Sequence, residues 1–211
     1  MMLSGLDDRS YARAMNSQAH IDKRELILAK GAQVMTRRGY HGTGVLEIVQ
    51  AAGIPKGSFY HYFTSKEDFA LQALDHLYGA RLERYQAALG AEAGPPAARI
   101  IGYYRELVAH FSRQERPEHH CFIGSLSFEM AELSQPIGQR VEAILQRSVA
   151  ILATCLEQAR LAEEIDPDTD CPALAQFIGN AWEGALLRMK VGRSVTPLQI
   201  FLTQLERLLR V

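Results

Sequence analysis

The chain has 211 residues, of which 47% are hydrophobic, and its formal net charge is −1. Such a length suits one large domain or a small domain joined to a medium one, and the apolar content is enough for a folded core. Three cysteines are too few for a disulfide framework, so we expect a reducing, cytoplasmic setting. Residues 1–20 lack the apolar stretch of a secretory signal, and no apolar run approaches the ~20 residues that cross a bilayer, so we expect no membrane partner.

The charge is unevenly distributed along the chain. Residues 1–66 hold nine Lys and Arg against five Asp and Glu, a net of +4, whereas residues 67–211 hold fourteen against nineteen, a net of −5. A basic end on an acidic body indicates that the N-terminal part meets a polyanion.

Apolar residues recur at i, i+3 and i+4 along the chain, which predicts an all-α fold of about nine helices. Residues 1–19 are polar and aperiodic, and we expect a flexible arm there. A first helix is predicted from His20 to Arg38, ended by Gly39. Its apolar side would carry Ile21, Leu26, Ala29 and Val34.

Two short helices and a long one are predicted next. The stretch Gly42-Thr43-Gly44 opens the first short helix and Gly53 ends it. Pro55 suits the first turn of the second. Ser65 is predicted to cap the long helix, residues 65–89, with Asp68 three residues on. Loop-forming residues and prolines at first-turn positions then predict five further helices, over residues 97–114, 120–133, 136–162, 171–193 and 197–210.

Residues 43–69, "TGVLEIVQAAGIPKGSFYHYFTSKEDF", have the layout of a helix-turn-helix. Phe59 and Phe63 lie four residues apart and should face inward together. The outward face would then carry hydroxyls and a cation that suit the phosphates and base edges of a major groove, from Lys56, Ser58, Tyr60, His61 and Tyr62. Gly57 permits close backbone approach, and Lys66 with its neighbouring N–H groups could hold a phosphate. The alternative is an ordinary helical hairpin with surface aromatics.

The region from about residue 24 to 70 resembles the DNA-binding domain of the TetR family of bacterial transcriptional regulators. The matching motifs are Gly39-Tyr40, Thr43, Ala51-Ala52-Gly53-Ile54, Lys56 to Phe63 and Ser65-Lys66-Glu67. The resemblance implies a three-helix helix-turn-helix domain over residues 20–66 and an all-helical domain for effector binding and dimerisation over residues 67–211. The implied contacts to double-stranded operator DNA are Thr43, Gly44, Lys56, Gly57, Ser58, Tyr60, His61, Tyr62 and Lys66.

The last two predicted helices carry wide apolar stripes, with small residues that permit close helix approach. One interpretation is a core within the chain. The resemblance implies in addition that these two helices form a four-helix interface in a homodimer, which would set two reading helices about 34–36 Å apart on DNA.

A small-molecule effector is the remaining partner that the resemblance implies. Helices between residues 97 and 193 should enclose its pocket. The candidate lining residues are Tyr103, Tyr104, His110, Phe128 and Trp182. Aromatic residues at helical spacing also suit a core.

The stretch "PEHHCF", residues 117–122, allows several interpretations. A metal site would need His119 and Cys121 to combine with His110 or Glu118, and no spacing motif supports this, so we predict no metal and no cofactor. A thiol in the first turn of a helix, beside histidines, should ionise more readily and be reactive. The alternative is a small buried thiol that fills the core.

A narrower resemblance favours the reactive thiol. "CFIGSLSFEMAELSQPI" and "AWEGALLRMKVGRSVTPL" resemble the TetR subgroup that contains NemR and the acrylate-responsive repressors. That resemblance implies Cys121 as the sensing thiol and Lys190 as its basic neighbour, although Lys190 could also be a snorkelling residue near a helix end. The glycine usual before the cysteine is His120 here. Cys155 and Cys171 are expected to be structural.

The combined hypothesis is a homodimeric repressor that leaves its operator when an electrophile or oxidant reacts with Cys121. A non-covalent sensor of a small hydrophobic ligand is the alternative within regulation. A thiol-dependent enzyme that uses Cys121 and His119 is the alternative of another class. It is disfavoured because there is no nucleophile elbow, phosphate loop or convincing carboxylate pair.

Overall fold

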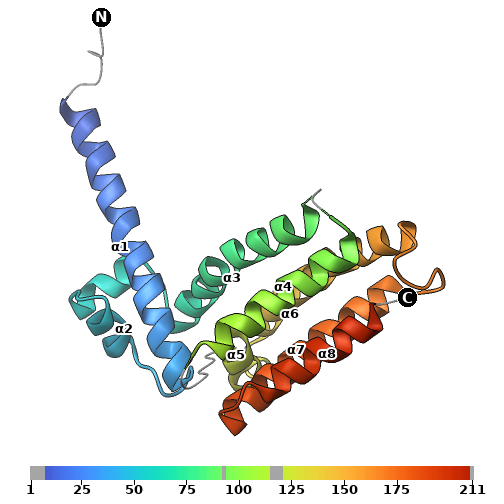
Figure 1. The fold of residues 1–211 in the computed structure, drawn as a ribbon. Coiled ribbons are helices and arrows are strands. Elements are labelled where there is room, and N and C mark those ends of the chain that lie inside the picture. The colour runs from blue at the N-terminus through green and yellow to red at the C-terminus, as the bar shows by residue number, and fades with distance from the viewer. Residues whose placement is uncertain (1–7, 92–93, 115–120, 210–211) are drawn as a thin grey trace, which may run out of the picture. The chain divides into compact units, whose positions relative to one another are not determined.

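The computed structural model describes residues 8–91, 94–114 and 121–209, with side chains from Lys23 onward. Within these ranges it has no strand, and the predicted all-α fold is confirmed. The helices are α1 (Asp8–Arg38), α2 (Val45–Ala51), the 3-10 helix η1 (Lys56–His61), α3 (Lys66–Gly90), α4 (Pro96–Ser112), α5 (Phe122–Met130), α6 (Gln135–Leu161), α7 (Cys171–Gly192) and α8 (Thr196–Leu208) (Figure 1). No described helix is both long enough and apolar enough to cross a membrane.

The chain packs into two compact units. The first combines Met1–Leu77 with Cys121–Val141, and the second combines Tyr78–His120 with Glu142–Val211. Both α3 and α6 therefore continue from one unit into the other. Helix α5, which we expected among the helices of the C-terminal domain, lies in the same unit as the helix-turn-helix. Cys121, which immediately precedes α5, therefore also lies in the unit of the helix-turn-helix.

The first unit has a core made by short apolar segments from several helices. Its fully buried large side chains include Ile27, Leu28, Met35, Ile48, Phe59, Phe63 and Phe69. Helix α1 starts at Asp8, so residues 8–19 are helical where we expected an arm. The reason is that this segment has no Gly or Pro and contains good helix formers such as Ala, Arg and Met. The predicted apolar side of α1 was also wrong in register, since Leu26 is 41% exposed.

The second unit has a core built from α3, α4, α6, α7 and α8. Helices α7 and α8 pack side by side, and α4 packs on α8 (Figure 1). The predicted start of α7 is confirmed, because Asp170 accepts a hydrogen bond of 3.0 Å from the backbone N–H of Ala173 and Pro172 occupies the first turn. The buried core side chains include Leu89, Ile100, Leu152, Leu156, Ile178, Met189, Leu198 and Leu205.

Candidate DNA-reading face and effector sites

The segment η1 presents most of the predicted reading side chains. Phe59 and Phe63 are 0% and 1% exposed, which confirms that they face inward. Their rings lie 5.2 Å apart between centroids, and both contact Phe69 of α3. Because these rings fix one side of η1, the opposite side projects outward: Lys56, Gly57, Tyr60 and His61 are exposed, while Ser58 and Tyr62 are half-buried.

The turn before α2, residues Gly39 to Gly44, forms hydrogen bonds within the protein through several of its polar groups. Gly44 is exposed and precedes the first helical residue, and its backbone N–H donates to Glu47 at 2.9 Å. Thr43 is only 1% exposed, and its hydroxyl donates to the carbonyl oxygen of Gly39 at 2.8 Å. The Thr43 side chain therefore shapes the turn, whereas the sequence predicted a DNA contact at this position.

Lys66 also contacts this turn. Its ammonium group donates to the carbonyl oxygens of Tyr40 and Thr43, at 3.1 Å each, and lies 4.2 Å from the centre of the Tyr40 ring. We expected Lys66 to hold a phosphate of DNA. In this structure the charge instead joins the start of α3 to the turn before α2.

Cys121 is the residue that caps the N-terminus of α5. Its Sγ accepts a hydrogen bond from the backbone N–H of Gly124 at 3.2 Å, and the side chain is half-buried and free of any disulfide. An N–H donor and the positive end of a helix both favour the thiolate form of a cysteine. The helix that follows buries Phe122, Ile123, Leu126 and Met130, whereas Leu133, in the turn after it, is 71% exposed.

The other two cysteines have different surroundings. Cys155 and Cys171 are 1% and 2% exposed. Burial raises the pKa of both thiols, and the carboxylate of Glu157 raises the pKa of Cys171 further. Both surroundings agree with the structural role expected from the sequence.

The remaining candidates for metal binding and sensing are His110, Glu118, His119 and Lys190. Among the described residues, no three His, Cys, Asp or Glu side chains are grouped to hold a metal ion, while Glu118, His119 and His120 lie outside the described residues. His110 is exposed at the end of α4, with a ring nitrogen 3.2 Å from the Gln114 amide nitrogen. Lys190 is exposed in the last turn of α7, in the second unit.

Three of the five predicted pocket residues form one aromatic cluster in the second unit. Tyr104 contacts the rings of Tyr103 and Trp182, with centroids 5.4 and 5.2 Å apart. Its hydroxyl lies 3.4 Å from that of Tyr85, and burial raises the pKa of both phenols above the ordinary value. Phe128, by contrast, is 82% exposed on α5 in the first unit.

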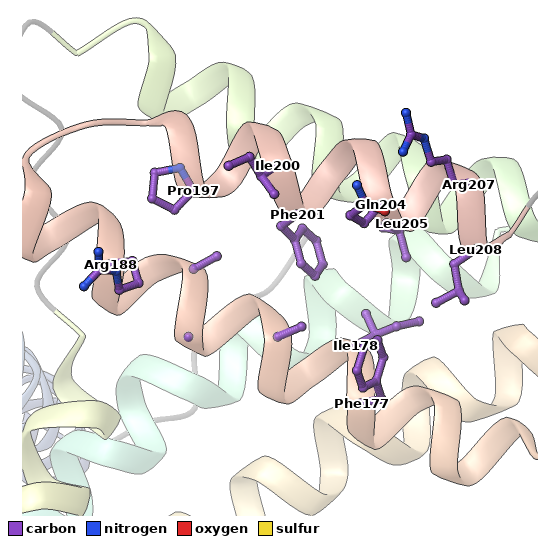
Figure 2. A pocket seen from close by; sticks show the side chains of 13 residues that line it. Phe177, Ile178, Arg188, Pro197, Ile200, Phe201, Gln204, Leu205, Arg207 and Leu208 are labelled. Carbon is purple, nitrogen blue, oxygen red and sulfur yellow. The ribbon is translucent and has the colours of Figure 1, made fainter.

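A groove of about 810 Å³ runs between α7 and α8. Figure 2 shows that side chains of both helices line it, and its lining residues include none of the five predicted pocket residues. Several apolar lining residues are unusually exposed for their size, namely Phe177 at 61%, Ile200 at 57% and Leu208 at 48%. An exposed apolar surface of this kind marks an interaction site.

Comparisons with known proteins match both the N-terminal and the C-terminal part of the chain. A family model described as bacterial regulatory proteins, tetR family, matches residues 27–73, and one described as tetracyclin repressor-like, C-terminal domain, matches residues 96–205. All nine candidate DNA contacts lie within the first of these matches.

Individual relatives match over most of their length. The HTH-type transcriptional repressor DhaR of Mycobacterium sp. (strain GP1) is 33% identical over 85% of this chain and 88% of its own. The HTH-type transcriptional repressor NemR of Escherichia coli (strain K12) is 32% identical over 92% of this chain and 98% of its own. A crystal structure of E. coli NemR in its reduced form superposes with a TM-score of 0.82 at 33% identity, covering 89% of this chain and 96% of that one.

Proposed function

The chain belongs to the TetR family of bacterial regulatory proteins, whose members are DNA-binding regulators and not enzymes, and we propose that it is a homodimeric repressor released from its operator by reaction at Cys121. The single observation that carries the proposal is that Cys121 caps a helix of the same compact unit as the reading face. The relatives DhaR and NemR are named as repressors, which supports repression as the mode of action.

The proposed reading face is the exposed side of η1. Tyr60 supports this role because 60% of it is exposed while its ring packs edge-on against buried Phe59, with centroids 5.3 Å apart. Such a ring is packed on one side and still accessible, so its hydroxyl can meet a base edge or a phosphate. Lys56 and His61 beside it add donors, and Gly57 leaves room for the DNA backbone.

The proposed dimer interface is the groove between α7 and α8. Its exposed apolar side chains would be covered by the same two helices of a second chain, in a self-complementary contact. A two-fold axis there would pair two reading faces for half-sites one DNA turn apart, about 34–36 Å.

The proposed effector is an electrophile or an oxidant. With an activated double bond, the thiolate sulfur of Cys121 forms a bond to the electron-poor carbon, and the neighbouring carbon takes a proton from water. The new group on sulfur would disturb the hydrogen bond from Gly124 that caps α5. Hundredfold release requires only about 2.7 kcal/mol of differential affinity between the two states.

The test uses the purified protein and a DNA duplex that it selects from a randomised pool. We expect brief treatment with N-ethylmaleimide or with hydrogen peroxide to abolish binding, with the mass change mapped to Cys121. Cys121→Ser should bind the duplex and stay bound after either treatment. Lys190→Met in the same assay tests whether this amine takes part in sensing, and Tyr60→Ala should abolish selective binding before any treatment.

The alternative within regulation is a non-covalent hydrophobic ligand. The aromatic cluster of Tyr85, Tyr103, Tyr104 and Trp182 supports it, because paired phenols could exchange their mutual contact for a polar group of a ligand. Binding that survives both reagents, with Cys121 unmodified, would favour this ligand and rule out the thiol switch.

A further inference from the structure

Helix α5 ends against the turn that precedes the helix-turn-helix. Near the end of α5, Glu129 accepts a hydrogen bond through Oε2 from the backbone N–H of His41, at 3.0 Å. Its other oxygen, Oε1, occupies the space where a β-carbon on Gly39 would lie. One carboxylate therefore contacts both Gly39 and His41, and Glu129 is far from them in sequence.

The turn itself sets the direction of α2. Gly39 has φ of +79°, a left-handed conformation that glycine adopts without steric cost, and this ends α1. Thr43 and Lys66 fix carbonyl groups of the same turn, and Gly44 is the residue immediately before α2. A carboxylate that holds this turn from outside the helix-turn-helix sequence consequently constrains where α2 and the reading segment after it point.

A second contact joins the other end of the helix-turn-helix to the same region. The hydroxyl of Ser134, in the turn after α5, donates to the carboxylate of Glu67 in the first turn of α3. The backbone N–H of Ser134 in turn bonds to the carbonyl oxygen of Met130, the last residue of α5, at 2.8 Å. The C-terminal end of α5 is thus hydrogen-bonded to the turn before α2, through Glu129. The turn that follows α5 is hydrogen-bonded to the start of α3, through Ser134.

We propose that Glu129 is a positioning residue for DNA reading, which holds the turn from Gly39 to Gly44 and transmits displacements of α5 to the reading face. The transmission rests on the proposed function, because it needs Cys121 as the switch at the N-terminal end of this helix. Helix α5 is nine residues long and hydrogen-bonded from end to end, so a shift caused at Cys121 moves Glu129 as well. The positioning role itself requires only that the protein binds DNA, whether or not Cys121 is a switch.

The first experiment measures affinity for the duplex selected by the wild-type protein. Glu129→Ala should lose about three- to tenfold, the range that one hydrogen bond at the surface represents. The salt dependence of the DNA affinity of Glu129→Ala should equal that of the wild type, because no phosphate contact is removed. Glu129→Gln retains a carbonyl acceptor and should bind nearly as the wild type does. Glu132→Ala, which removes an exposed carboxylate in the turn after α5, is the matched control.

Two further readouts separate positioning from general stability. Deuterium uptake over residues 39–44 should rise in Glu129→Ala but not in Glu132→Ala, because the N–H of His41 loses its acceptor. Treatment with N-ethylmaleimide should also change the affinity of Glu129→Ala by a smaller factor than that of the wild type, because the link to the turn has been cut.

The proposal fails if Glu129→Ala keeps wild-type affinity and wild-type uptake over residues 39–44. Should that variant not fold, Glu129→Asp takes its place, since its shorter side chain keeps the charge but does not reach both Gly39 and His41; wild-type affinity in it overturns the proposal. Failure of the proposed function looks different. In that case the wild-type protein selects no duplex, or selects one and holds it after Cys121 has been alkylated.

Discussion

The ammonium group of Lys66 donates a hydrogen bond of 3.1 Å to the carbonyl oxygen of Tyr40 and lies above the ring of the same residue. A lysine at the start of a helix beside a DNA-reading segment could instead be expected to bind phosphate. In this chain its charge is used to hold the turn before α2, so its influence on DNA binding should be indirect.

Lys66→Ala should therefore lower the stability of the first unit and the affinity for DNA together. Each of the two lost hydrogen bonds has a charged donor. Loss of such a bond lowers the free energy of unfolding by about 1.5–3 kcal/mol, and by less where water replaces the donor. The slope of log affinity against log salt should remain that of the wild type. Chemical denaturation and fluorescence anisotropy over a salt series measure the two effects.

Lys56→Ala is the matched comparison, because Lys56 is exposed on η1. Its stability should be unchanged, and its salt slope should fall by about one for each half-site. A reduced slope and unchanged stability in Lys66→Ala would instead mean that this lysine reaches a phosphate in the complex.

The order and bounds of the helices follow from local chemistry, which explains why the sequence predicted most of them. Proline suits the first turn of a helix and turn-forming residues flank its ends, so α7 was expected over residues 171–193 and is found at Cys171–Gly192. The helical segment after Pro55 was also expected, but its short 3-10 geometry was not. In that segment Phe59 packs against Phe63 and Phe69, and the contact with Phe69 of α3 is one that the sequence did not predict.

The site was only partly predictable, for a different reason. Exposure of Tyr60 follows from the spacing of Phe59 and Phe63, which is a local pattern. The role of Lys66 depends on where the carbonyl groups of a turn distant in the sequence point, and that of Thr43 depends on how its own turn folds back to Gly39. Glu129 was missed entirely, because its contact with His41 joins segments far apart in the sequence and no motif surrounds it.

The three cysteines should differ strongly in reactivity towards N-ethylmaleimide. Burial raises the pKa of Cys155 and Cys171, which lowers the fraction of nucleophilic thiolate and also blocks access. Cys121 is half-buried and accepts an N–H hydrogen bond, so it should be labelled first in the folded protein. Mass mapping against time measures this order. In urea, where the chain is unfolded, the three cysteines should be labelled at equal rates. Equal rates in the native protein would contradict the burial of Cys155 and Cys171.

Stability of the first unit should fall in acid because of Asp68. Burial alone would raise its pKa, but hydrogen bonds from Gln72 and Thr64, with the charge of Arg24, hold the pKa below the ordinary value of 3.8. A depressed pKa means that the carboxylate stabilises the folded state above 3.8 and that this contribution is lost as the pH falls through the lower, folded value.

Asp68→Asn should accordingly be less stable than the wild type at neutral pH by about 0.3–1 kcal/mol, the effect of a carboxylate near a helix N-terminus. The difference should shrink as the pH drops below 3.8. Urea denaturation over a pH series tests this, with Glu132→Gln as a control of equal charge change. A difference that stays constant down to strong acid would mean that the charge of Asp68 does not contribute.

The groove between α7 and α8 gives the sharpest prediction about assembly. Ile200 lines the groove and is 57% exposed, so Ile200→Asp should leave the fold of one chain intact. In a two-fold dimer the substitution would bury two unpaired carboxylates, at about 3 kcal/mol or more each. Sedimentation should then show a monomer, and affinity for DNA should fall because two linked reading faces become separate ones. Leu161→Asp is the control, because Leu161 is 72% exposed near the end of α6 and is not a lining residue of the groove. A dimer that persists in Ile200→Asp, or dissociates only in Leu161→Asp, would place the interface elsewhere.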